Sequence, residues 1–140
     1  MGIKRTPADC AFSKCVRAAV NWTCQKCGSY FPEGSRGGLD CSHHHGRGNW
    51  SIRFDPMNAE ALCYGCHSHY GGTEERRNEV MTEEEQELLF EKKRDAQLGK
   101  EYRRTKGKGA VAKHYREQLE EIERQRAEGN QGKLTFVGWI

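Results

Sequence analysis

Two CxxC pairs carry the most specific chemical signature in this chain. They are Cys24 and Cys27 in "CQKC", and Cys63 and Cys66 in "CYGC". A two-residue gap lets both thiolates of a pair face one ion, and four thiolates at tetrahedral distance form a closed structural zinc site. A redox role is the alternative for a single pair, but two pairs in a chain with few apolar residues favour zinc. We therefore predict a structural Zn²⁺ on these four cysteines.

Histidines gather around the same cysteines. Thirty-five residues separate the two pairs, against about 15–20 in a plain zinc ribbon. The insertion contains "DCSHHHGRGNW", with three consecutive histidines at positions 43–45, and His67 and His69 follow the last cysteine of the pairs. A neutral imidazole can accept a proton from water near pH 7. A zinc clamp that brings these histidines together would therefore create a candidate hydrolytic site.

The amino-acid composition and the N-terminal sequence predict a small hydrophobic core and a cytoplasmic location. Only 35% of the 140 residues are hydrophobic and 31% are charged, so a small core needs a metal or another covalent staple. Seven cysteines are an odd number for a disulfide framework. The N-terminus has no apolar run typical of a secretory signal, and no stretch of about 18 apolar residues marks a membrane span. We expect a cytoplasmic protein with no membrane contact, in the bacterial host cell if it is phage-encoded.

Charge is unevenly distributed along the chain. Residues 1–70 carry eight Lys/Arg against five Asp/Glu, residues 71–100 six against nine, and residues 101–140 nine against six. Basic ends around an acidic middle are compatible with binding to nucleic acid. Solvated helix faces explain the acidic middle equally well.

The predicted elements would place the ligand-type residues on a small α+β framework. Residues 7–22 form an amphipathic helix with Asp9 as N-cap, and Cys15 falls on its apolar face with Phe12 and Val16. Two extended segments, roughly 39–45 and 58–62, are joined by a long hairpin connection. "CYGCHSHYGG" reads as one or two helical turns ended by its two glycines. Cys15 is therefore expected to be a buried thiol, whereas Cys10 and Cys41 have no clear assignment.

The rest of the chain is predicted to be helical. Thr82 and Glu85 form a capping box for a helix that Gly99 would end. A second helix, within residues 106–129, has a narrow apolar stripe that should pack on the preceding structure. Residues 134–140, "LTFVGWI", form an apolar tail that would either dock on the core or bind a partner through Trp139. We predict two units, residues 1–75 with the zinc site and residues 76–140 as a helical extension.

The stretch from the histidines to the second cysteine pair resembles the HNH endonucleases, whose core is the ββα-metal motif. The match runs through His43, then Asn58 in "FDPMNAEALC", then His67 in "CYGCH". The wording is most similar to phage recombination nucleases of the NinG/Rap and Ref kind, and the resemblance covers roughly residues 9–72. It implies a zinc-stapled ββα-metal core with an N-terminal helix.

The resemblance also implies roles for the three matched residues. His43 would be the general base, Asn58 would orient it or support the metal, and His67 would hold a catalytic divalent metal, with Mg²⁺ or Mn²⁺ expected. HNH enzymes commonly have an acidic metal ligand directly before the base, and Ser42 stands there in this chain. We consider Asp40, His44, His45 and His69 as replacements. An adjacent His–His arrangement like that of colicin nucleases, with His44 as base, is the alternative register.

Other interpretations of these residues stay open from sequence. Asn58 can be a turn residue after Asp55-Pro56. His43 can be a structural zinc ligand, but four cysteines already fill that site. Arg47 and Arg53, in the hairpin connection, are candidates for contacts with DNA phosphates or can be solvated surface.

The expected function is a metal-dependent DNA endonuclease, structure-selective or weakly sequence-specific, in phage or prophage recombination or DNA processing. Duplex, branched or single-stranded DNA is the expected partner, and a recombinase or another replication or recombination protein would bind through the tail. A non-catalytic zinc-ribbon nucleic-acid-binding module is the first alternative, and a redox or interaction protein is the second.

Overall fold

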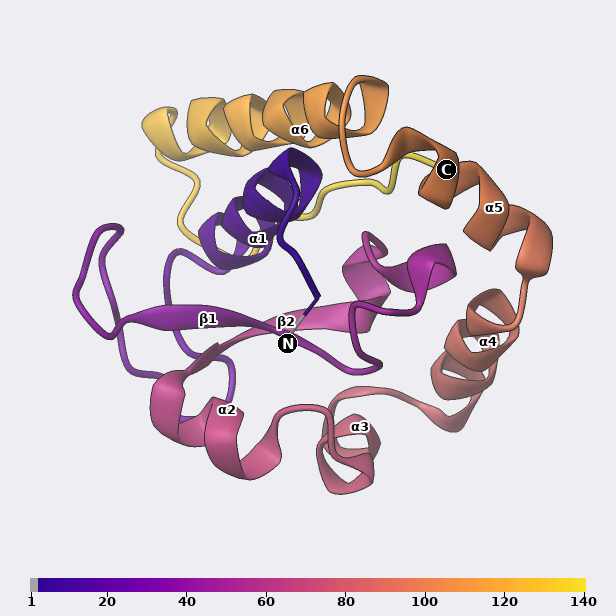
Figure 1. Ribbon diagram of the computed structural model, residues 1–140. Coiled ribbons are helices and arrows are strands. Elements are labelled where there is room, and N and C mark those ends of the chain that lie inside the picture. Colours follow the sequence, from indigo (N-terminus) through magenta and orange to yellow (C-terminus); the bar gives the residue numbers. More distant parts are fainter. Residues whose placement is uncertain (1–2) are drawn as a thin grey trace.

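The computed structural model describes residues 3–140 and has a mixed α+β architecture around a two-stranded hairpin (Figure 1). Strand β1, Leu39–His43, pairs antiparallel with β2, Ala59–Cys63, so that His43 lies opposite Ala59. Helix α2, Tyr64–Tyr70, follows β2 without a loop. The predicted class is confirmed at this level: an N-terminal helix, an antiparallel hairpin and a helical C-terminal part.

Helix α1, Pro7–Ala19, has its N-cap three residues before the predicted one. Thr6 is the N-cap, its side chain accepts a hydrogen bond from Asp9 N, and the Asp9 carboxylate accepts one from Thr6 N at 2.7 Å. Pro7 occupies the first helical position, where its missing N–H is not needed. Asp9 is therefore the third helical residue of a capping box, and it was wrongly predicted as the cap itself.

Four further helices follow the hairpin and α2. They are α3 Glu74–Val80, α4 Glu83–Lys93, α5 Ala96–Thr105 and α6 Ala110–Ala127. The capping box of Thr82 and Glu85 is confirmed at the start of α4. The predicted stop at Gly99 is wrong: α4 ends at Lys93, Asp95 caps α5 by accepting from Leu98 N, and Gly99 lies within α5. The short 3₁₀ helices η1, Trp50–Ile52, and η2, Pro56–Asn58, lie in the hairpin connection.

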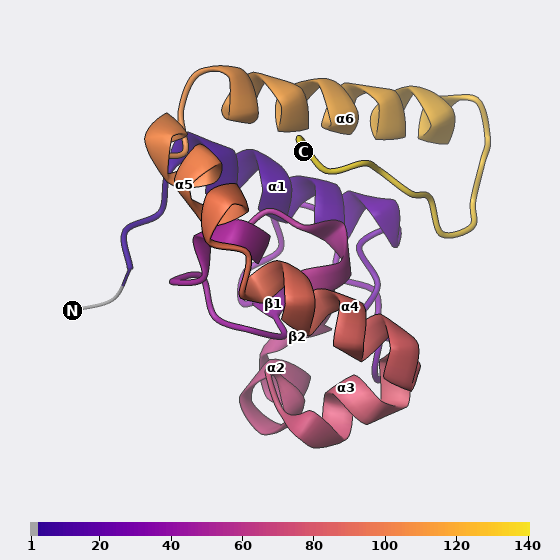
Figure 2. The same ribbon diagram turned by 90° about the vertical axis from the view of Figure 1, so that its right-hand side faces the viewer.

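The core lies between α6, α1 and the hairpin, which form successive layers with α1 in the middle (Figures 1 and 2). Phe12 of α1 packs its ring against Phe54, Tyr115 and Phe136 at centroid distances of 6.0, 5.3 and 5.8 Å. Buried Cys15 donates to Tyr115 O at 3.2 Å, which confirms the prediction of a buried thiol. Residues from both predicted units share this core, so the boundary at 75/76 does not separate two independent cores.

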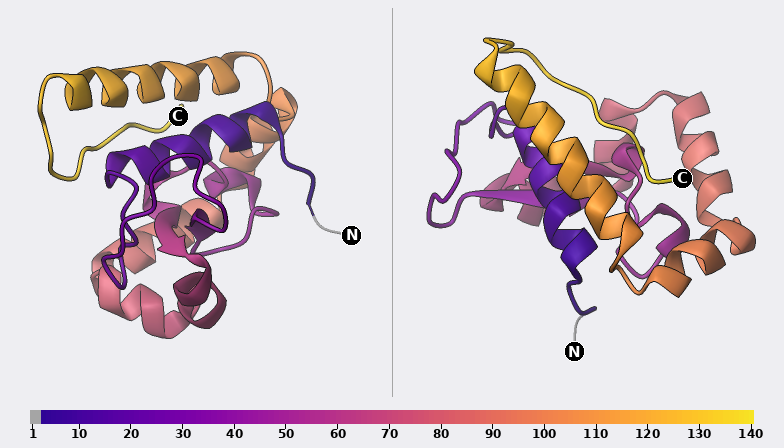
Figure 3. Two further views of the ribbon diagram at one scale, coloured as in Figure 1. Left: turned by 90° about the vertical axis from the view of Figure 1, so that its left-hand side faces the viewer. Right: turned by 90° about the horizontal axis from the view of Figure 1, so that it is seen from above.

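The C-terminal tail runs back along α1 and α6 (Figure 3). Leu134 N donates to Ala19 O at 2.8 Å, and Trp139 N donates to Tyr115 Oη at 3.1 Å. The Trp139 ring packs on Tyr102 at 5.5 Å. Of the two predicted alternatives, the structure thus has the tail docked on the protein's own core. Trp139, the side chain expected to anchor a partner, is therefore engaged within the protein itself.

Among residues 3–140, none of the helices has the length and apolar character needed to cross a bilayer.

Candidate metal centre and active site

The four CxxC cysteines form one cluster. Their sulfur atoms all lie within 4.8 Å of one another, and Cys27 Sγ is 3.9 Å from Cys63 Sγ. A tetrahedral ion with Zn–S bonds of about 2.3 Å requires sulfurs about 3.8 Å apart. Cys24 and Cys27 lie in the turn after α1, Cys63 ends β2, and Cys66 lies in α2. The cluster can therefore hold a metal ion, and a thiolate set of this kind suits Zn²⁺.

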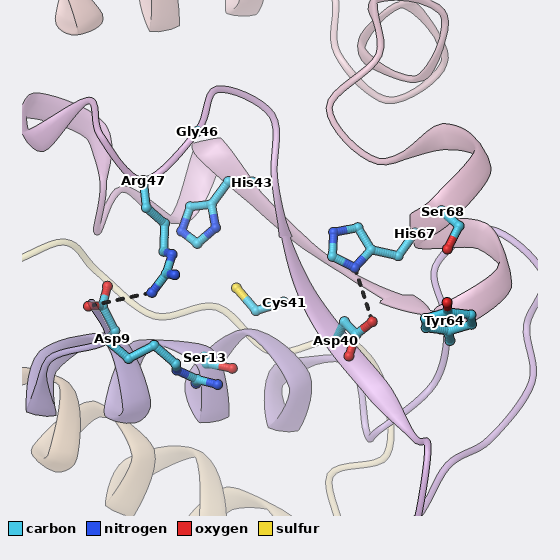
Figure 4. A pocket seen from close by; sticks show the side chains of 11 residues that line it. Asp9, Ser13, Asp40, Cys41, His43, Gly46, Arg47, Tyr64, His67 and Ser68 are labelled. Atoms are coloured by element: carbon cyan, nitrogen blue, oxygen red, sulfur yellow. Dashed lines mark hydrogen bonds and ion pairs between the residues drawn. The ribbon is translucent and has the colours of Figure 1, made fainter. Parts of the chain in front are cut away.

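A cavity of about 760 Å³ opens where α1, β1 and α2 meet (Figure 4). The residues before and in α1 form one wall, the end of β1 and the following loop form the floor, and α2 forms the opposite wall. The lining residues are Arg5, Asp9, Ser13, Asp40, Cys41, His43, Gly46, Arg47, Tyr64, His67 and Ser68. Two of the three residues matched to the HNH motif, His43 and His67, thus face one space.

The His43 imidazole at the end of β1 is fixed from two sides. Its Nε2 lies 3.2 Å from Arg53 O, and its ring stacks on Phe12 with centroids 6.0 Å apart. Because a carbonyl only accepts, the proton must be on Nε2, and Nδ1 carries the lone pair. Burial lowers the pKa of His43 to about 4, which keeps the ring neutral at pH 7. The ring can therefore act as a proton acceptor.

Asp40 and His67 form a pair on the opposite side of the cavity. Asp40 Oδ2 lies 3.0 Å from His67 Nδ1, and the two side chains are 42% and 41% exposed. Gly71 closes the space behind the imidazole, because a Cβ at this position would lie 2.4 Å from His67 Cδ2. A carboxylate oxygen and an imidazole nitrogen, both open to solvent, are a donor set that suits a divalent cation. Among the four considered replacements for the missing acidic ligand, Asp40 is the one beside His67.

Asn58 lies outside the cavity and is fully buried inside the hairpin connection. Its Oδ1 accepts from His45 N at 2.9 Å, and its Nδ2 donates to His45 O at 2.9 Å and to Ile52 O at 3.1 Å. All its polar atoms are thereby occupied by main chain. Asn58 cannot reach a reacting group from this position, so its assignment as catalytic is corrected to that of a positioning residue for the loop.

His44, His45 and His69 are not brought to the cavity. His44 is 5% exposed, and its carbonyl accepts from Arg77 Nη1 at 3.2 Å. His45 lines a separate cavity of about 260 Å³ against α3 and α4. His69 is exposed on α2 and packs against Tyr70. In this arrangement none of the three stands beside Asp40 and His67 as a further ligand.

The two arginines predicted to contact DNA have different surroundings. Arg47 lines the cavity, donates to Ile3 O at 2.8 Å and lies 3.9 Å from Asp9 Oδ2. Arg53 is buried, and its guanidinium donates to both Asp9 carboxylate oxygens at 3.0 and 2.6 Å. The prediction for Arg53 is wrong, because its charge is neutralised inside the protein and cannot reach a phosphate.

Sequence reasoning gave no site role to seven of the eleven lining residues, among them Arg5, Cys41 and Tyr64. Arg5, Asp9 and Ser13 recur every four residues, which is the one sequence signal that could have placed Arg5 on the cavity side. Burial raises the pKa of the Cys41 thiol to about 12, so it stays protonated and is a poor nucleophile. Tyr64 lies one helical turn before His67, and it belongs to no sequence motif that would mark it as a site residue.

The chain matches no known family model, and no curated protein or solved structure is significantly similar to it.

Proposed function

We propose that the protein is a metal-dependent endonuclease that hydrolyses phosphodiester bonds of DNA, with β1, β2 and α2 serving as an HNH-like ββα-metal core. The observation that carries this proposal is the arrangement across the cavity. A neutral, oriented imidazole, His43, faces the same space as a solvent-open carboxylate–imidazole pair, Asp40 and His67. Hydrolysis of a phosphodiester requires a base for water on one side of the phosphorus and an electrophile on the other.

His43 would remove the proton of the attacking water. Its Nε2–H is held by Arg53 O, so Nδ1 takes up the proton and the carbonyl stabilises the resulting imidazolium. The stacking contact with Phe12 fixes the plane of the ring. The phosphate's negative charge would raise the low pKa of the buried imidazole on binding, which makes it a better base in the complex than in the free protein.

Asp40 and His67 would hold the catalytic cation, for which oxygen and nitrogen donors fit Mg²⁺ or Mn²⁺. Such a cation polarises the phosphate and stabilises the leaving oxygen. The chain's own contribution is orientation. The packing of Gly71 holds the His67 ring, and the cysteine cluster fixes the start of α2 against β2.

Arg5 and Arg47 supply positive charge for the phosphates. Both line the cavity, and within residues 3–140 no ion pair is formed by Arg5. Contacts of this type give sequence-independent affinity that falls with salt. We therefore propose structure-selective or weakly sequence-specific cutting. The resemblance to phage recombination nucleases supports a role in recombination or DNA processing, with a recombinase as a proposed partner.

A zinc-containing nucleic-acid-binding module without catalysis is the second candidate. The cysteine cluster and the basic residues would serve it equally well. It does not explain why a buried imidazole faces an open Asp–His pair, because binding to phosphate needs neither.

A cleavage assay separates the two candidates. Duplex, single-stranded, flapped and four-way DNA are incubated with the protein and Mg²⁺ or Mn²⁺. Cleavage should depend on the cation, and His43→Ala should lower the rate by about 10²–10⁴-fold while zinc content and DNA binding persist. His69→Ala is the matched control, because this exposed imidazole lies outside the cavity. If His43→Ala cuts like the wild type, the assigned base is wrong, and if no substrate is cut with either cation, the binding module is favoured.

A further inference from the structure

Tyr64 is an exposed aromatic ring at the edge of the proposed active site. Its side chain is the most exposed of the large apolar side chains in residues 3–140, at 72%. A single exposed ring is unremarkable on a protein surface. Tyr64, however, also lines the cavity that contains His43 and the Asp40–His67 pair (Figure 4).

Helix geometry places Tyr64 next to the cation-binding pair. Tyr64, His67 and Ser68 are separated by three and four residues in α2, so they share one face of the helix. Three residues of helix correspond to a rise of about 4.5 Å between Tyr64 and His67. Tyr64 therefore stands about one helical turn from His67, on the wall of the cavity that α2 forms.

The two walls of the cavity differ in chemistry. Arg5 and Arg47 lie on the α1 and loop side, whereas Tyr64 lies on the α2 side together with His67. Basic groups on one side and an aromatic ring on the other are the two components of single-strand recognition, in which phosphates follow the charge and bases stack on the ring. In continuous duplex the base faces are already covered by their neighbours and are not free to stack on a side chain.

We propose that Tyr64 stacks on an unpaired nucleobase next to the scissile phosphate, so that the site prefers single-stranded or branched DNA over continuous duplex. This inference rests on the proposed function for the identity of the cut bond. The stacking itself concerns binding and can be measured without cleavage.

The test uses DNA with 2-aminopurine placed in a single-stranded flap, and the same label in a duplex. Binding is followed by anisotropy and by quenching of 2-aminopurine, without added Mg²⁺ or Mn²⁺. No chelator is present, since it would remove the structural metal. Tyr64→Ala should weaken flap binding by roughly 5- to 150-fold, the range found for loss of one base–aromatic stack, and should leave duplex binding unchanged. Tyr64→Phe should retain the affinity and the quenching.

Tyr30→Ala is the matched control, because Tyr30 is also exposed, at 61%, and does not line the cavity. It should bind every DNA like the wild type. Equal losses on flap and duplex, or no loss in Tyr64→Ala, would overturn the stacking proposal even if the protein cuts DNA. Conversely, quenching that depends on Tyr64 in a protein that cuts nothing would support the base contact and reject the nuclease function.

Discussion

The buried ion pair between Asp9 and Arg53 gives the sharpest prediction about stability. The guanidinium donates to both carboxylate oxygens at 3.0 and 2.6 Å, and the two side chains are 4% and 2% exposed. Burial alone would raise the pKa of Asp9, but hydrogen bonds from Arg53 and Thr6 outweigh it and leave that pKa below its ordinary value. The carboxylate is therefore ionised at neutral pH and compensates the buried cation.

Asp9→Asn removes the negative charge with almost no change in volume. An uncompensated charge left by breaking a buried pair costs about 3–5 kcal/mol. The substitution also weakens the capping box at the start of α1, which would contribute up to about 1–2 kcal/mol. We expect the free energy of unfolding to fall by about 3–7 kcal/mol, a large part of the 5–15 kcal/mol of a typical domain.

Urea denaturation followed by circular dichroism measures this change, with zinc content determined in parallel. The exposed pair of Lys113 and Glu117, 3.8 Å apart, supplies the control, and Glu117→Gln should leave the midpoint unchanged. In the double variant Asp9→Asn/Arg53→Met both charges are gone, so part of the lost stability should return. An Asp9→Asn protein with the wild-type urea midpoint would refute the reasoning and would return Arg53 to the list of candidate DNA contacts.

The remaining predictions concern the cysteine cluster and the dependence of stability on pH. Cys66→Ser should release zinc and unfold the hairpin region, measured by elemental analysis and circular dichroism, whereas Cys10→Ser, an exposed cysteine on α1, should do neither; a folded Cys66→Ser protein with full zinc content would contradict the assignment. Acid should destabilise the fold between pH 6.5 and 4, because burial lowers the pKa values of His43, His44 and His45, and the unfolded chain takes up protons first. His43, whose pKa falls to about 4, would account for about 3 kcal/mol of this loss. His43→Gln should therefore flatten the dependence of the urea midpoint on pH, and an unchanged slope would show that its pKa is not lowered.

Local sequence signals predicted the parts of the fold that depend on near neighbours. The two CxxC pairs, the capping box of Thr82 and Glu85, and the end of α2 at Gly71 depend on spacings of two to four residues. The break between α4 and α5 also had a local signal, since Asp95 is a favoured N-cap residue. It was outweighed by the helical pattern on both sides and by Gly99, which looked like a stop.

Contacts between distant residues account for the errors in the candidate site. Whether Arg53 meets DNA or Asp9 depends on a partner 44 residues earlier in the chain, and nothing in "SIRFD" indicates it. Asp40 was one of four candidates from sequence, and its place beside His67 arises from the pairing of β1 with β2 and the direct start of α2. Tyr64 and Arg5 are identified as site residues only because they line the cavity.

Two separate sets of interactions hold the two sides of the proposed site. One is the cysteine cluster and the other is the Asp9–Arg53 ion pair, and Arg53 also contacts His43. The cysteine cluster fixes the start of α2 and thus His67. On the other side, the Arg53 side chain is tied to α1 through Asp9, while its main-chain carbonyl accepts the hydrogen bond from His43. Asn58 also holds the hairpin connection in place, because its side chain hydrogen-bonds to the main chain of His45 and Ile52. The positions of the proposed base and of the proposed cation-binding pair therefore depend on different interactions. Loss of the cysteine cluster should disturb His67 first, whereas loss of the Asp9–Arg53 pair should disturb His43 first.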